Sequence, residues 1–225
     1  MNKSIVFKSL NKIGIALIAL TAIGFATTNS ASAATVTTLL QDDFNQENNG
    51  VGALNYNKFT NFDVIKGSVD LIGNGFFDFF PSNGLYVDLD GSTFLAGTLQ
   101  SKQTFNFQAG DIVNLSFQLA GNQRNGMIDP VTVSLGSLYT ETFSLPQSDG
   151  FTTFSRNFTV TSASATSATL NFQETGTDNI GLLLDNVTLT KSVPEPGSIM
   201  GLLAFGAFGA TSLCKRKQQQ SATNA

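Results

Sequence analysis

The sequence predicts an all-β protein, an antiparallel jelly-roll β-sandwich, and three observations lead to this fold class. Short runs rich in Val, Phe and Thr recur between clusters of Gly, Asn and Asp over residues 34–191. Several of these runs alternate apolar and polar residues, as half-buried strands do. No stretch of this body has the 3.6-residue period of an amphipathic helix. About ten short strands of this kind are typical of a sandwich or barrel, and a jelly roll suits the number.

The strands are expected between turn signals such as Asn48-Asn49-Gly50 and Ala109-Gly110-Asp111. Residues 113–119 alternate most cleanly. In residues 85–91, alternation places Asp88 and Asp90 on the same face. The expected strands, in chain order, are residues 35–40, 64–72, 85–91, 98–107, 113–119, 131–135, 139–145, 154–160, 168–172 and 182–190.

Both ends of the chain have the pattern of targeting segments. Three lysines and no acid precede an apolar run at Ile13–Phe25, and Ala31-Ser32-Ala33 is a small-x-small cleavage site. Residues 1–33 are therefore predicted to be a secretory signal peptide. The alternative, an uncleaved membrane helix, is disfavoured because a span needs about 20 apolar residues.

A second apolar segment, Gly197–Leu213, lies near the other end and contains no charge. It is long enough for a short transmembrane helix, and the cluster Lys215, Arg216 and Lys217 behind it would stay on the cytoplasmic side. The preceding prolines, in Val193-Pro194-Glu195-Pro196, predict an extended linker. Residues 218–225 form a polar tail.

Pro194, Glu195 and Pro196, the short span and the basic cluster together resemble the PEP-CTERM sorting signal of bacterial exopolysaccharide producers, over residues 192–217. The resemblance implies an exosortase, a membrane protease, as processing partner. Pro194, Glu195 and Pro196 would be the recognition residues, and Lys215, Arg216 and Lys217 would hold the tail during processing. It also implies export through the inner membrane to the cell surface or matrix, with a transient or permanent C-terminal membrane anchor. An ordinary single-pass anchor is the alternative.

The charge and composition of the body exclude several functions. Residues 34–192 carry 15 Asp and Glu against 6 Lys and Arg, a net charge of −9, which disfavours nucleic acid as a partner and favours cations. The chain contains no His, which removes Ser-His-Asp and Cys-His catalysis. The acids Glu47, Glu141 and Glu174 are scattered, without the pairing that glycoside hydrolysis needs. The protein is predicted not to be an enzyme, with glycoside hydrolase as a remote alternative.

One acid, Asp185, interrupts the apolar run Leu182–Leu189. A buried carboxylate needs a partner, and a bound Ca²⁺ would supply one. The sequence Leu184-Asp185-Asn186-Val187 resembles the last strand of galactose-binding-like jelly rolls, including carbohydrate-binding modules. That resemblance implies a structural Ca²⁺ held by Asp185 and by Asp42 or Asp43. The alternative is an Asp that accepts hydrogen bonds from turn amides.

Three further groups of residues allow two interpretations each. Asp88 and Asp90 could hold a cation, but the pattern favours the solvent-exposed face of an antiparallel sheet. The loop residues Asn122, Gln123 and Arg124 form the best polar cluster for a neutral sugar, although a plain solvated loop is favoured. The phenylalanines around Asp78 suggest a binding surface, but filling the core is favoured because the chain has 20 Phe and no Trp.

Two functions remain after these exclusions. The first is an exported, non-enzymatic surface or matrix protein with a structural or adhesive role, sorted by its C-terminal signal. The second is a carbohydrate-binding module that recognises exopolysaccharide.

Overall fold

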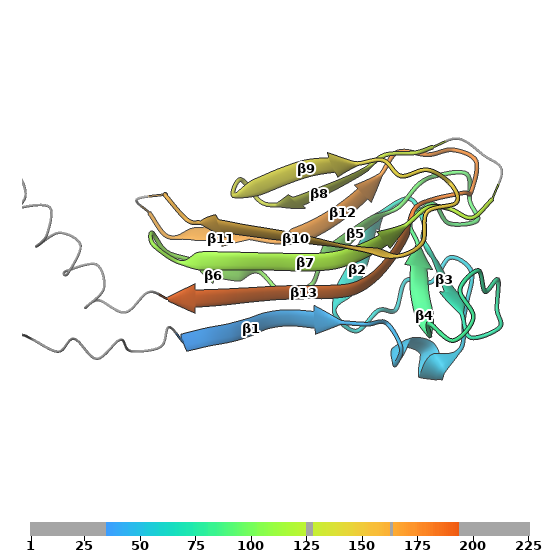
Figure 1. The fold of residues 1–225 in the computed structure, drawn as a ribbon, viewed down its shortest axis with the longest axis horizontal. Helices are drawn as coiled ribbons and strands as arrows, with labels where there is room; N and C mark the ends of the chain where they lie inside the picture. The colour runs from blue at the N-terminus through green and yellow to red at the C-terminus, as the bar shows by residue number, and fades with distance from the viewer. Residues whose placement is uncertain (1–34, 125–127, 163, 194–225) are drawn as a thin grey trace, which may run out of the picture. The chain divides into compact units, whose positions relative to one another are not determined.

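The computed structural model describes residues 35–124, 128–162 and 164–193, whose regular secondary structure is almost entirely β-strand (Figure 1). The all-β prediction is confirmed. The elements are β1 (Thr35–Asp42), the 3₁₀ turn η1 (Glu47–Gly50), β2 (Phe62–Lys66), β3 (Asp70–Gly73), β4 (Leu85–Asp88), β5 (Thr98–Ser101), β6 (Phe105–Phe107), β7 (Ile112–Ala120), β8 (Val131–Leu135), β9 (Tyr139–Phe143), β10 (Thr152–Thr159), β11 (Thr166–Ala168), β12 (Leu170–Glu174) and β13 (Leu183–Val193).

Two antiparallel sheets form the sandwich. One has the order β10-β7-β13-β4-β3, with β1 also paired to β13, and the other has the order β2-β5-β12-β8-β9. A small ribbon of β6 and β11 lies beside them. Figure 1 shows β8, β9 and β12 in one layer and β7, β13 and β1 in the other. Strands that are distant in sequence therefore pair, as in a jelly roll.

The last strand, β13, organises the six-stranded sheet. One edge of β13 pairs with β7 over most of its length. Its other edge is shared, because β4 pairs with Leu183 and Leu184 and β1 pairs with Val187–Val193. The strand alternates Leu and Val with Thr after Asp185, so one side faces the core and the other faces solvent. The first and last strands of the described body, β1 and β13, are therefore neighbours in the same sheet.

Three expected strands are each divided in two. Residues 64–72 form β2 in one sheet and β3 in the other, and residues 98–107 and 168–172 are similarly split between the ribbon and the five-stranded sheet. The first division occurs at Gly67, whose φ of +60° suits glycine, and where a Cβ would overlap the carbonyl oxygens of Leu95 and Ala96. The alternation of apolar and polar residues continues where the chain passes from one sheet to the other, so the sequence pattern does not reveal the division.

Phenylalanine fills much of the core between the sheets. A chain of ring contacts runs from Phe59 through Phe44, Phe62 and Phe172 to Phe117. These five side chains are fully buried, with exposed fractions of 0%. Edge-to-face and tilted ring pairs of this kind add to the stabilisation by burial. The expectation of a Phe-rich core is correct for these residues.

The Phe-rich segment around Asp78 lies elsewhere. Phe76, Phe79 and Phe80 pack in a second apolar cluster around Tyr86, separate from the main core. The Tyr86 hydroxyl accepts hydrogen bonds from the backbone N–H groups of Phe79 (2.6 Å) and Phe80 (3.2 Å). The segment therefore covers the outer face of β3 and β4. These three rings fill a second, smaller apolar cluster and not the main core, and Phe77 is 58% exposed, because consecutive rings cannot all enter one sheet interface.

The predicted signal peptide, the C-terminal helix and the sorting residues lie outside the described residues. Within residues 35–124, 128–162 and 164–193, no helix is long and apolar enough to cross a membrane.

Candidate functional site

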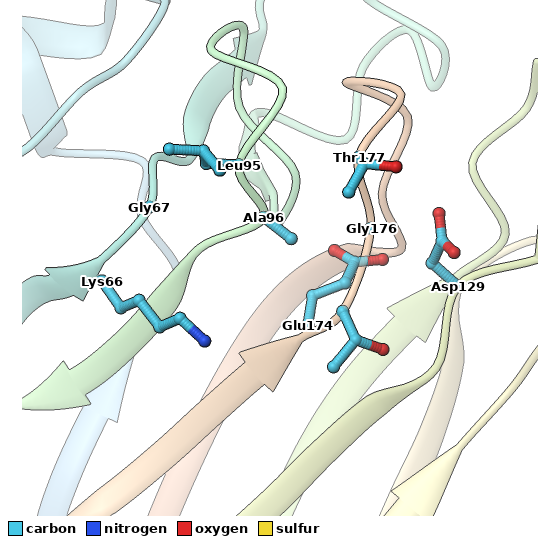
Figure 2. Close-up of a pocket in the computed structure, with 9 residues that line it drawn as sticks. Lys66, Gly67, Leu95, Ala96, Asp129, Glu174, Gly176 and Thr177 are labelled. Atoms are coloured by element: carbon cyan, nitrogen blue, oxygen red, sulfur yellow. The ribbon is translucent and has the colours of Figure 1, made fainter.

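A pocket of about 420 Å³ opens at one end of the five-stranded sheet, where β2 and β12 end and β5 and β8 begin. Figure 2 shows Glu174 at the end of β12, between Lys66 at the end of β2 and Asp129 next to β8. Leu95 and Ala96 add apolar surface, and Gly176 and Thr177 complete the wall. With Thr175 also in the lining, the pocket combines two carboxylates, an ammonium group and two hydroxyls with apolar side chains. That is the usual composition of a small ligand site.

Acids that are buried or half-buried cluster beside the pocket. Asp90 follows β4, Asp129 precedes β8, and Asp178 lies between β12 and β13. One carboxylate oxygen from each lies within 4.8 Å of the other two. Glu174 is 2% exposed, and its Oε1 accepts a hydrogen bond from the Leu182 N–H at 2.8 Å. Three loops at one end of the sandwich therefore bring their acids together.

The electrostatics of this cluster favour neutral carboxyls. Burial raises the pKa of Asp90 and of Asp129, and it raises the pKa of Glu174 well above the ordinary value. The nearby acids raise all three further, because like charges disfavour ionisation. The backbone N–H groups of Asp178 and Asn179 approach Asp90 and lower its pKa by less than burial raises it. They do not reach hydrogen-bond geometry with its oxygens.

Asp88 is buried beside this cluster but has its own partner. Its Oδ2 accepts a hydrogen bond from the Arg124 guanidinium, and its Oδ1 accepts one from the Gly181 N–H at 3.0 Å. Burial raises the pKa of Asp88 to about 7, although Arg124 lowers it. Asp88 and Asp90 are 1% and 0% exposed, so the favoured interpretation of a solvent-exposed face was wrong. The outer face at this end of β4 is covered by the segment around Phe79 and by Arg124.

The loop that contains Asn122, Gln123 and Arg124 is fastened to the body rather than solvated. The Gln123 amide donates to the carbonyl oxygens of Gly121, Gln147 and Asp149, at 3.1, 3.0 and 2.7 Å. Asn122 is 3% exposed and its Oδ1 accepts from the Arg124 N–H. Gln123 and Arg124 line a shallow hollow of about 270 Å³. The favoured solvated loop was wrong for residues 121–124, and sugar binding by them stays a prediction.

The acids predicted to hold Ca²⁺ at the last strand lie near one another. The charges of Asp43 and Asp42 contribute to the raised pKa of Asp185, about 6, for which burial is the main cause. Asp185 accepts hydrogen bonds from Asn83 and Asn186, and Asp42 accepts them from the Phe44 N–H and Asn61. The alternative interpretation, an acid bonded by amides, describes these contacts. Calcium at Asp185, Asp42 and Asp43 stays a prediction.

Sequence reasoning missed the acids that form the deepest cluster. Asp129 and Asp178 lie in polar loops, where acids are ordinarily solvated, and their spacing matches no metal motif. Glu174 was expected to be isolated, yet it shares the pocket with Asp129. For Asp129 and Asp178 the sequence held no signal beyond the general excess of acids over bases, whereas Asp90 had been noted, with Asp88, as a possible cation ligand. Which acids meet is decided by the pairing of distant strands.

Comparison with protein families gives a match in the C-terminal part of the chain, outside the β-sandwich. Residues 192–217 match the family described as the PEP-CTERM protein-sorting motif. The chain carries a PEP-CTERM sorting signal. The PEP-CTERM match confirms the predicted bounds and implies export and sorting to the cell surface with processing by an exosortase.

Solved structures similar to the body include carbohydrate-binding modules and parts of larger proteins. The C-terminal CBM6 of LamC, a marine laminarinase from Zobellia galactanivorans, is 13% identical with a TM-score of 0.39, over 69% of this chain and 99% of that one. A CBM6 of Cellvibrio mixtus lichenase 5A, in complex with cellotriose, is 11% identical with a TM-score of 0.34, over 68% and 97%.

The CBM22-1 and GH10 modules of a Clostridium thermocellum endo-1,4-β-D-xylanase are 15% identical with a TM-score of 0.41, and the match covers 68% of this chain and 28% of that one. With TM-scores below 0.5, the likeness is limited to the jelly-roll arrangement of antiparallel sheets and says nothing about what this chain binds. Comparison with curated proteins gives no match.

Proposed function

We propose that the chain is an exported bacterial surface protein whose β-sandwich is delivered by the PEP-CTERM signal and an exosortase, with a non-enzymatic structural or adhesive role. The observation that carries this proposal is the position of the last strand. Thr35 pairs with Val193, the final residue of β13, and Pro194 follows directly. A cut near Pro194-Glu195-Pro196 therefore leaves every strand of the body complete. The cargo stays folded after the tail is removed.

Processing is tested on the protein as the producer exports it. We expect mass spectrometry of the exported chain to find its C-terminus near Pro194, because the family's protease cuts near this motif. A strain without the exosortase is the control, and there the chain should retain Ala225. An exported protein that still ends at Ala225 in the normal strain would contradict processing and favour a permanent anchor.

The carboxylates at the pocket support a non-catalytic role. Glycoside hydrolysis needs one protonated carboxylic acid and one ionised carboxylate. Here burial raises the pKa of both Asp129 and Glu174. The chain also contains no His to take either role. The pocket is therefore better suited to holding a ligand than to cleaving one.

A second candidate function, binding of exopolysaccharide, is favoured by the pocket itself. Its volume of about 420 Å³ falls in the range of small-ligand sites, and its carboxylates, hydroxyls and Lys66 can bond to sugar hydroxyls. The absence of Trp and the presence of only three Tyr weaken stacking on sugar rings. Binding would then depend on polar contacts within the pocket.

The binding candidate is tested with the producer's own exopolysaccharide. We expect saturable binding by the full chain, weakened about tenfold by Lys66→Glu, because the substitution removes a donor and adds a third acid to the pocket. Lys58→Glu is the matched control, since Lys58 is exposed and does not line the pocket. Equal loss in both variants would show unspecific attraction. Release of reducing ends, abolished by Glu174→Gln, would instead establish an enzyme.

A further inference from the structure

The three carboxylates beside the pocket are close enough together to be ligands of one cation. Asp90, Asp129 and Asp178 each offer an oxygen within 4.8 Å of the other two. Ligands on opposite sides of Ca²⁺ lie about 4.6–5.2 Å apart, because each bond is about 2.3–2.6 Å long. The three oxygens therefore fit within one Ca²⁺ coordination sphere.

A second observation is independent of this spacing. Asp90 is 0% exposed, and within the described part of the chain no group forms a hydrogen bond to either of its carboxylate oxygens. Asp129 is 8% exposed, and its Oδ2 is also unpartnered. Buried carboxylate oxygens without donors are costly and rare, so they call for a specific explanation.

Among the described residues, no basic side chain forms an ion pair with Asp90 or Asp129. The ion pair at this end of the sandwich joins Arg124 to Asp88. The Ile180 N–H donates to Asp178 Oδ1 at 3.2 Å, but this contact leaves the other two acids uncompensated. A single cation would neutralise three carboxylates at once. A set of oxygen ligands alone is the preference of Ca²⁺.

Gly176 lies directly against two of these carboxylates, and its lack of a side chain leaves space for them. A Cβ on Gly176 would overlap Asp90 Oδ2 and lie 2.8 Å from Asp129 Oδ2. Gly176 also lines the pocket, so an ion held by these acids would lie close to the pocket wall. Glu174, whose buried Oε2 has no hydrogen-bond partner among the described residues, is a fourth carboxyl group beside the cluster.

We propose that Asp90, Asp129 and Asp178 bind one Ca²⁺ ion that ties together three loops at this end of the sandwich. The site differs from the one predicted around Asp185, where the carboxylates accept hydrogen bonds from amides. An exported protein meets calcium at concentrations that suit extracellular modules, which bind it with Kd values of about 10⁻⁴–10⁻³ M. The inference does not depend on the proposed function.

The experiment counts bound ions and follows thermal unfolding of the full chain, purified in detergent and treated with chelator. Equilibrium dialysis against Ca²⁺ gives the number of ions, and circular dichroism gives the Tm because the chain has no Trp for fluorescence. We expect 10 mM Ca²⁺ to raise the Tm by about 5–10 °C, as for a ligand at about 100 times its Kd. An equal rise with Mg²⁺ would overturn the assignment to Ca²⁺.

Two variants test the location of the ion. Asp90→Asn should bind one ion fewer than the normal chain, and in chelator its Tm should be higher, because a buried carboxylate has been removed. Gly176→Ala keeps every charge and should also lose one ion, so it serves if Asp90→Asn does not fold. Asp63→Asn, at an exposed acid, and Asp185→Asn, at the sequence-predicted site, are the matched controls.

The outcomes separate the possible sites. The proposal is supported if Asp90→Asn and Gly176→Ala each bind one ion fewer while Asp63→Asn binds as many ions as the normal chain. The ion count of Asp185→Asn does not affect this conclusion. An unchanged ion count in Asp90→Asn or in Gly176→Ala overturns it. Absence of saturable Ca²⁺ binding by the normal chain also overturns it.

Discussion

Replacing Phe117 by Ala is expected to lower the free energy of unfolding by about 3–5 kcal/mol, a large part of the stability of a domain of this size. Phe117 lies in the middle of β7, is 0% exposed, and contacts Phe143, Phe172 and Phe154 at ring-centroid distances of 5.3, 5.4 and 5.9 Å. Truncation leaves a cavity between the sheets that three rigid rings cannot close. The expected fall in Tm is about 8–15 °C, measured by circular dichroism.

Phe94→Ala is the control for this prediction. Phe94 is 64% exposed, so its removal should change stability by no more than about 0.5 kcal/mol. Similar effects of the two substitutions would contradict the ring contacts described for the core.

Arg124→Ala is expected to destabilise the protein by about 3 kcal/mol at pH 8 and by less at pH 5. The substitution leaves Asp88, 1% exposed, without its cation, and an uncompensated buried charge is costly. It also removes bonds to the carbonyl oxygens of Asn122 and Asn179, at 3.2 Å each, whose loss does not depend on pH. Urea denaturation at pH 5 and pH 8 separates the pH-dependent loss of the ion pair from the pH-independent loss of the hydrogen bonds.

The pH dependence follows from the raised pKa of Asp88. In the folded protein this pKa is about 7, above the ordinary 3.8, so the folded state holds a proton that the unfolded state releases. The stability that Asp88 contributes is complete below about pH 4 and is lost as the pH rises through 7. Without Arg124 the pKa rises further, because the guanidinium lowers it. The pH-dependent part of the destabilisation by Arg124→Ala therefore appears only at pH values at which Asp88 is ionised in the normal protein.

Two comparisons make this prediction specific. The double variant Arg124→Ala, Asp88→Asn should recover part of the loss at pH 8, because no charge is left behind. Lys102→Ala, which breaks the exposed pair with Asp63, should cost at most about 0.5 kcal/mol at either pH. A cost of Arg124→Ala that is the same at pH 5 and pH 8 would show that Asp88 is not the reason.

The sandwich and the candidate site differ in how far the sequence predicts them. Alternation along residues 113–119 and 131–135 predicts strands that exist, because the period of two is a local property of a half-buried strand. It does not reveal that residues 64–72 cross from one sheet to the other at Gly67. It also placed Asp88 and Asp90 on a solvent-exposed face, since it cannot show that the outer face of β4 is covered by the segment around Phe79.

The sequence by itself determined the all-β class, the anionic and histidine-free composition of the body, and the sorting signal at residues 192–217. These are local or compositional properties, which a linear pattern contains in full. Only the tertiary structure decided that Asp90, Asp129 and Asp178 meet, since they come from loops that are far apart in the chain. Their meeting depends on β4 ending, and β8 and β13 beginning, at the same end of the sandwich. The pairing of distant strands is encoded in the packing of the whole core.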